Sequence, residues 1–142
     1  MTRVCSKAVV MRLMIYEQIK AAIPALKATK GKIVLVSSGA ATGAYSAWGA
    51  YGASKAALNH VAMTLAVEEP DITTVAIRPG TVDTEMQREI REIHHQTMDK
   101  KAHEKFSGLH SRGELLKPEQ PGHVIARLAL DAPKEFNGQF LK

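Results

Sequence analysis

A serine, a tyrosine and a lysine in one short stretch of this chain have the types and spacing that chemistry could use. Tyr51 follows Ser38 by thirteen residues, and Lys55 follows Tyr51 by four, which puts the tyrosine and the lysine on one face if this stretch is a helix. A phenol has an ordinary pKa of about 10, and a neighbouring ammonium group favours its charged form. The pair is therefore a candidate general acid and base. We expect the Ser38 hydroxyl to hydrogen-bond the substrate oxygen with which Tyr51 exchanges a proton.

The elements predicted around these residues place them at one end of a sheet. Residues 32–37 form a short β-branched run, typical of a buried parallel strand. The Gly- and Ala-rich residues 39–49 are predicted to be a loop, and 50–69 a helix that ends before Pro70. Because Ser38 directly follows the strand, it lies where open α/β sheets bind their ligands.

The rest of the chain continues the alternation of helices and strands. In order, the other predicted elements are a helix over 8–28 that Pro24 interrupts, a buried strand over 73–77, mostly helical sequence over 85–105, a helix from Pro118 to about 130 and a final strand over 138–141. This order predicts an α/β fold with about three parallel strands joined by right-handed crossovers. Three strands are few for a doubly wound sheet, so we expect the sheet to be incomplete.

Length and composition indicate one soluble globular domain. The chain has 142 residues, of which 45% are apolar and 23% charged, and these are ordinary proportions. The net charge of +5 comes from basic residues that alternate with acids, as in residues 88–92, so we predict no nucleic-acid binding. No apolar run is long enough to predict a membrane span.

The cysteine and histidine positions argue against an intramolecular disulfide and against a metal site. Cys5 is the only cysteine, so no intramolecular disulfide can form, and we expect a reducing compartment, the cytoplasm. Arg12 interrupts the apolar stretch near the start, which argues against a secretory signal. The adjacent His94 and His95 diverge by about 100° on a helix. No cysteine or carboxylate cluster completes a metal site around them, so we predict none.

A second tyrosine and lysine, Tyr16 and Lys20, have the same spacing as the first pair. Thirteen residues before Tyr16 stands Arg3, and no predicted strand leads to it. We interpret this pair as a coincidence on a helix surface. For Tyr51, by contrast, the serine, the strand, the glycine-rich loop and the following helix all agree.

The stretch from Ser37 to Lys55 resembles the active-site half of the short-chain dehydrogenases/reductases, which are NAD(P)-dependent enzymes with a Rossmann fold. The overlapping residues 36–43 are most similar to fungal carbonyl reductases of the benzil- or sepiapterin-reductase type. The resemblance covers nearly all of the chain, from about 8 to 141. It implies a single truncated domain, 1–142, with a partial Rossmann fold that lacks the N-terminal dinucleotide-binding half.

The resemblance implies a role for each of the three residues. Ser38 would position the carbonyl or alcohol oxygen of a small substrate, and Tyr51 would donate or remove its proton. Lys55 would favour the phenolate and hydrogen-bond the ribose of the nicotinamide. The implied reaction is hydride transfer between NAD(P)H and a carbonyl compound or secondary alcohol.

A second local match is the turn Pro79-Gly80-Thr81-Val82-Asp83-Thr84, which follows the predicted strand over 73–77. In the family this turn meets the nicotinamide. The resemblance therefore implies that Tyr51, Lys55, Pro79, Gly80, Val82 and Thr84 bind the cofactor, with the Val82 backbone and the Thr84 hydroxyl on its carboxamide. It favours NADP over NAD.

One family motif is absent from the sequence. No Gly-x-x-x-Gly-x-Gly loop is found, and the family binds the cofactor pyrophosphate there, where helix amino ends favour anions. Two functions therefore stay open. The chain is either part of an NAD(P)-dependent oxidoreductase, or a truncated and catalytically inactive relative that acts at most as an interaction module.

Three further segments have roles implied by the resemblance. Trp48 borders the family's substrate pocket, although simple packing explains it equally well. Residues 85–106 correspond to a region that covers the substrate, although a charged surface helix fits their composition too. The helices 8–28 and 50–69 correspond to the pair that forms homodimers, and a clean monomer in light scattering would remove that hypothesis.

Overall fold

The computed structural model describes residues 3–94 and 98–142, with side chains from Ile15 onward; His95, one of the two adjacent histidines, lies outside these ranges. In chain order the elements are α1 (Arg3–Thr29), β1 (Lys32–Val36), the short 3-10 turn η1 (Gly39–Ala41), α2 (Gly49–Glu68), β2 (Thr73–Ile77), α3 (Glu85–Glu92), α4 (Lys100–Ser111), α5 (Glu119–Asp131), the turn η3 (Lys134–Phe136) and β3 (Phe140–Leu141).

The described strands form one sheet in the order β1-β2-β3. All pairs are parallel, with Lys32 opposite Thr73 at the start of the first pair and Ile77 opposite Leu141 at the end of the second. Every residue of the central strand β2 is buried, as expected for a strand covered on both faces. The predicted α/β fold with three parallel strands is confirmed.

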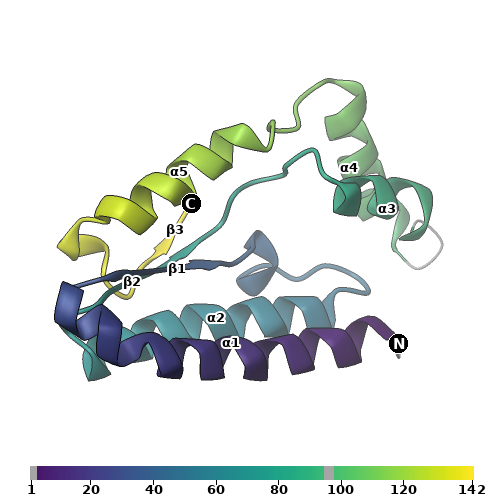
Figure 1. The fold of residues 1–142 in the computed structure, drawn as a ribbon. Helices are drawn as coiled ribbons and strands as arrows, with labels where there is room; N and C mark the ends of the chain where they lie inside the picture. Colours follow the sequence, from purple (N-terminus) through teal and green to yellow (C-terminus); the bar gives the residue numbers. More distant parts are fainter. Residues whose placement is uncertain (1–2, 95–97) are drawn as a thin grey trace.

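Helices cover both faces of the sheet. Helices α1 and α2 lie side by side against one face, and α5 lies on the other (Figure 1). Successive residues of β1 divide between the two cores: Leu35 packs with Leu58 of α2, and Val34 packs with Leu128 of α5. This alternation follows from the two-residue period of a strand, and it gives a three-layer arrangement.

Helix α1 is longer than predicted and runs through Pro24 without a break. Proline removes one backbone hydrogen bond. In the two turns before Pro24, Ile19 and Ile23 pack into the core beside α2, which holds the helix together. The helix ends where the Gly31 N–H donates to the Leu26 carbonyl at 2.7 Å, a common helix C-terminal motif.

Helices α3 and α4 lie past the carboxyl ends of β1 and β2, away from the other helices (Figure 1). The sequence predicted mostly helical structure over 85–105, whereas the structure has two separate helices there. The second is capped by Asp99, whose carboxylate accepts a hydrogen bond from the Ala102 N–H at 2.9 Å. Such a capped start marks a new helix.

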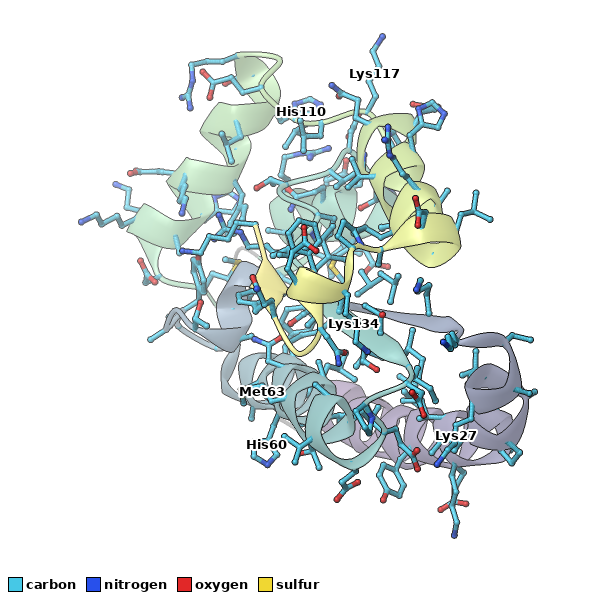
Figure 2. All side chains as sticks on the ribbon, turned by 90° about the vertical axis from the view of Figure 1, so that its left-hand side faces the viewer. Lys27, His60, Met63, His110, Lys117 and Lys134 are labelled. Atoms are coloured by element: carbon cyan, nitrogen blue, oxygen red, sulfur yellow. The ribbon has the colours of Figure 1, made fainter. Side chains whose placement is uncertain are left out.

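The outer surface of α1 and α2 faces solvent. His60 and Met63 project from α2 away from the sheet (Figure 2), and Met63 is 51% exposed. Tyr16 on α1 is 54% exposed, so the second tyrosine–lysine pair lies on an open surface. Self-association through these helices stays a prediction. In the part of the chain that is described, no helix has the length and apolar character needed to cross a membrane.

Candidate active site

A cleft of about 520 Å³ opens at the carboxyl ends of β1 and β2. Its walls come from the loops that follow these strands, from the start of α2 and from α3, α4 and α5. Ser38, Tyr51 and the turn 79–84 all contribute to its lining. The structure therefore brings these predicted site residues together where α/β sheets bind ligands.

Ser38 is held in place by the turn that follows β1. Its Oγ accepts a hydrogen bond from the Ala40 N–H at 3.2 Å and so caps the turn η1. Because the oxygen is the acceptor in this bond, the hydroxyl proton is left to donate to another group. The local sequence thus orients a hydrogen-bond donor at the cleft.

Tyr51 reaches the cleft because α2 packs very closely on that same turn. A Cβ at Gly52 would lie only 2.6 Å from the Ala40 carbonyl oxygen, so only glycine permits this approach. The Ser54 hydroxyl donates to the Tyr51 carbonyl inside the helix. Gly52 therefore sets the position of the phenol relative to Ser38.

Lys55 links α2 to the end of β1. Its ammonium nitrogen donates to the Val36 carbonyl at 2.7 Å, and its own carbonyl accepts from the Ser37 hydroxyl at 3.2 Å. The Nζ atom lies 5.8 Å from the centre of the Tyr51 ring. The tyrosine and the lysine are therefore neighbours, as the helical spacing requires.

Lys55 lines a second groove rather than the cleft itself. This groove has a volume of about 510 Å³ and follows the outer edge of β1 between α1 and α2. Ser37 directs its N–H toward β2, where it donates to the Ile77 carbonyl at 2.8 Å. By the alternation of a parallel ladder, Val36 faces the other way, so its carbonyl meets Lys55 at the edge of the sheet.

The turn after β2 needs glycine at Gly80. This residue has a φ of +87°, and a Cβ there would lie 2.8 Å from a Leu116 methyl carbon. Leu116 holds the turn in place through two backbone hydrogen bonds. Its N–H donates to the Thr81 carbonyl at 2.9 Å, and its carbonyl accepts from the Asp83 N–H at 2.8 Å. The backbone of the turn is therefore fixed on one side.

The Thr81 carbonyl and the Asp83 N–H both point toward Leu116. Because backbone groups alternate along an extended chain, the Val82 N–H points to the opposite side of the turn. The Thr84 hydroxyl donates to the Val82 carbonyl at 3.3 Å. The turn thus offers backbone N–H and C=O groups beside a hydroxyl, a set that matches the carboxamide of a nicotinamide.

Three aromatic side chains line the cleft beside Tyr51: Tyr45, Trp48 and Phe106, which together form an aromatic wall. Trp48 stacks on Phe106 with 5.3 Å between ring centres and 15° between planes, and meets the Tyr51 ring edge-on at 5.5 Å. Tyr45 lies 5.4 Å from Trp48. Trp48 therefore packs against its neighbours and also lines the cleft, and its place in a substrate pocket stays a prediction.

Several residues that line the cleft were not predicted from the sequence. The Arg78 side chain lies beside Gly39, where a Cβ would be 3.2 Å from its Cδ atom. Gln87 of α3 and Phe106 of α4 also line the cleft. Both lie in the stretch 85–106, which by the resemblance corresponds to a region that covers the substrate, but the sequence singled out neither residue. No group of three or more metal-ligating side chains is found among the described residues.

The sequence profile of the family described as short chain dehydrogenase matches residues 10–95, more than half of the chain. The chain belongs to the short-chain dehydrogenase family. Curated relatives in this family include benzil reductases and sepiapterin reductases, so the predicted similarity to that group is confirmed.

Two relatives of this short-chain dehydrogenase chain are fungal. Benzil reductase ((S)-benzoin forming) of Saccharomyces cerevisiae is 48% identical over 126 residues, which cover 84% of this chain and 48% of that protein. An uncharacterized oxidoreductase of Schizosaccharomyces pombe is 45% identical over 129 residues, covering 90% of this chain and 52% of that protein. The chain thus spans about half the length of these relatives.

Solved structures of short-chain dehydrogenases agree with the fold. The short-chain dehydrogenase/reductase YIR035C of Saccharomyces cerevisiae has a TM-score of 0.87 and 46% identity, covering 89% of this chain and 51% of its own. An angucycline C-6 ketoreductase solved with bound NADP has a TM-score of 0.59 and 27% identity, covering 79% of this chain and 41% of its own. The partial Rossmann fold is therefore confirmed.

Proposed function

We propose that this chain carries the ketone-binding and proton-transferring half of an NAD(P)-dependent carbonyl reductase. The observation that supports it most is the cleft that gathers the Ser38 hydroxyl, the Tyr51 phenol and the turn 79–84 at the carboxyl ends of two parallel strands. The names of relatives, a benzil reductase and a ketoreductase, support a carbonyl substrate.

The reaction is the reduction of a ketone to a secondary alcohol. NAD(P)H, when bound, would supply the hydride that the carbonyl carbon needs. Tyr51 gives its phenolic proton to the carbonyl oxygen and is reprotonated from solvent. Ser38 donates a hydrogen bond to that oxygen, which stabilises the negative charge that develops on it. One hydride and one proton are thus added to the C=O bond.

Lys55 stabilises the phenolate that Tyr51 becomes when it gives up its proton. An ammonium near the ring favours the charged form of the phenol, and Nζ lies 5.8 Å from the ring centre. The turn 79–84 would hold the nicotinamide through the Val82 backbone and the Thr84 hydroxyl. Pro79 and Gly80 shape this turn. NADP is the favoured cofactor because the ketoreductase neighbour was solved with it.

The alternative is a catalytically inactive chain that acts as an interaction module. The groove along the outer edge of β1 favours it, because no described strand pairs with that edge, and an open strand edge is a surface that other chains can bind. The two functions differ in whether this chain supports ketone reduction once the half that it does not span is supplied.

The isolated chain is expected to show no NADPH binding in the micromolar range and no turnover of a diketone. The physical reason is that the sequence lacks a Gly-x-x-x-Gly-x-Gly loop to bind the pyrophosphate at a helix amino end. NADPH fluorescence is titrated with the chain, and NADPH oxidation is followed with benzil. Saturable binding at micromolar NADPH would contradict this expectation.

The proposed chemistry is tested in a hybrid reductase, in which this chain replaces the segment that it matches in the Saccharomyces cerevisiae benzil reductase. The yeast benzil reductase thus supplies the part of the enzyme that this chain does not span. We expect the hybrid reductase to oxidise NADPH when benzil is present. A folded hybrid that binds NADPH but reduces no ketone would support the inactive alternative instead.

A further inference from the structure

Gln87, in the first turn of α3, is a buried polar residue in the wall of the cleft. It is 7% exposed, and its Oε1 atom has no hydrogen-bond partner among the described residues. Buried amide groups are nearly always paired, because an unpaired one loses its bonds to water without replacement. The missing hydrogen-bond partner of the Gln87 Oε1 atom therefore needs a physical explanation.

Capping of α3 does not provide that reason. Thr84 and Gln87 have the spacing of a capping box, in which each side chain would bind the backbone N–H of the other residue. The Thr84 hydroxyl instead turns to the Val82 carbonyl and makes no bond to the helix. Since the Gln87 oxygen is unpaired too, its side chain does not stabilise the start of α3.

The surroundings of Gln87 in the cleft are largely apolar. Ile90, one turn later on α3, is 3% exposed and packs in one cluster with Phe106 and Trp48. Met86 lines the same cleft. The aromatic wall and α3 thus offer a surface for an aromatic group, and Gln87 lines the same cleft with an amide oxygen that has no partner among the described residues.

A ketone oxygen accepts hydrogen bonds, so only the amide N–H groups of Gln87 can pair with it. A 180° rotation of the side-chain amide places Nε2 where Oε1 stands, and Nε2 then donates to such an oxygen. In the proposed reaction, the reacting carbonyl is held by Ser38 and Tyr51. A ketone that also pairs with Gln87 must therefore carry a second oxygen.

We propose that Gln87 and the aromatic wall form a substrate subsite that selects aryl 1,2-diketones, with Gln87 binding the carbonyl oxygen that is not reduced. This subsite rests on the proposed reductase function. Benzil, named for the yeast relative, has this chemistry, because its two adjacent carbonyl groups each carry a phenyl ring. Gln87 would then determine specificity, while Ser38 and Tyr51 carry out the reaction.

The test compares benzil with deoxybenzoin, which has the same two rings but only one carbonyl oxygen. In the hybrid reductase, the Gln87→Leu variant is expected to lose about 10- to 100-fold in kcat/KM for benzil. The value for deoxybenzoin should change by less than about threefold, because that ketone has no oxygen for the amide to bind. An equal loss for both ketones, or no loss for either, would overturn the subsite.

Three controls distinguish the subsite from a cofactor contact, a structural role and a loss of the reductase function. The Kd for NADPH should be the same in Gln87→Leu and the unchanged hybrid, and weaker cofactor binding in the variant would mean that the amide binds the cofactor instead.

The melting temperature of the chain should stay equal or rise with Gln87→Leu, since the unpaired amide is removed. A fall of several degrees would show a structural role and contradict the proposal. A hybrid that reduces neither ketone counts against the reductase function.

Binding is also measured without turnover. Trp48 is the only tryptophan in the chain, and it belongs to the aromatic wall, so benzil should quench its fluorescence in the isolated chain. We expect Gln87→Leu to raise the Kd for benzil about tenfold and to leave the Kd for deoxybenzoin unchanged. Equal benzil affinity in both forms would overturn the subsite even if the hybrid is inactive.

Discussion

Replacing Tyr51 by phenylalanine is expected to lower kcat for benzil in the hybrid reductase by roughly 100- to 10,000-fold, the range that general acid catalysis contributes. The change removes only the phenolic oxygen. The ring that meets Trp48 edge-on at 5.5 Å stays, so the aromatic contacts and the packing of α2 are preserved. The rate is measured from NADPH oxidation under saturating ketone.

The matched control is Tyr16→Phe, because Tyr16 has the same spacing to a lysine but is 54% exposed on α1. This variant should keep the unchanged rate, and Tyr51→Phe should keep the NADPH affinity. A Tyr51→Phe hybrid that reduces benzil within about threefold of the unchanged rate would refute the role of Tyr51 as the acid.

Gly52→Ala is expected to lower kcat about 100-fold although Gly52 takes no part in the chemistry. A Cβ at this position would lie 2.6 Å from the Ala40 carbonyl oxygen, so α2 and the turn η1 must move apart. Ser38 sits at the start of that turn and Tyr51 precedes Gly52, so the movement separates the two groups that hold the substrate oxygen. Displacements of about 1 Å in an active site can cost about 100-fold in rate.

Gly49→Ala provides the control for this substitution. Gly49 is the first residue of α2, and nothing lies within 4 Å of a Cβ placed there. We expect unchanged activity and equal or slightly higher stability, because alanine favours helix more than glycine does. Circular dichroism checks that both variants are folded. Similar rates for Gly52→Ala and Gly49→Ala would show that the close approach of α2 does not position Tyr51.

The sequence predicted the fold well where local patterns determine it. The strands over 32–37 and 73–77, and the helix between them, appear almost where the hydrophobic pattern placed them. The predicted burial of the first strand is wrong: only Leu35 of β1 is buried, because β1 lies at the edge of the sheet. Tyr51 and Lys55 are neighbours because a helix brings residues four apart onto one face. Ser38 lies in the same cleft as Tyr51 because both elements meet at the carboxyl end of β1.

What the sequence could not predict depends on contacts between distant segments. Pro24 does not interrupt α1, because packing on α2 and β1 outweighs the loss of one backbone bond. The burial of Gln87 and the stacking of Phe106 on Trp48 arise only once α3 and α4 fold over the loop after β1. Lys55 binds the Val36 carbonyl because that edge of β1 faces away from β2.

The proposed reaction requires Ser38 and Tyr51 to bind one and the same carbonyl oxygen. A crystal structure of the hybrid reductase with NADP⁺ and a slowly reacting diketone would show this oxygen. We predict that one ketone oxygen lies within about 2.6–3.2 Å of both Ser38 Oγ and Tyr51 Oη. A diketone bound with both oxygens beyond hydrogen-bond reach of these two hydroxyl groups would refute the proposed chemistry.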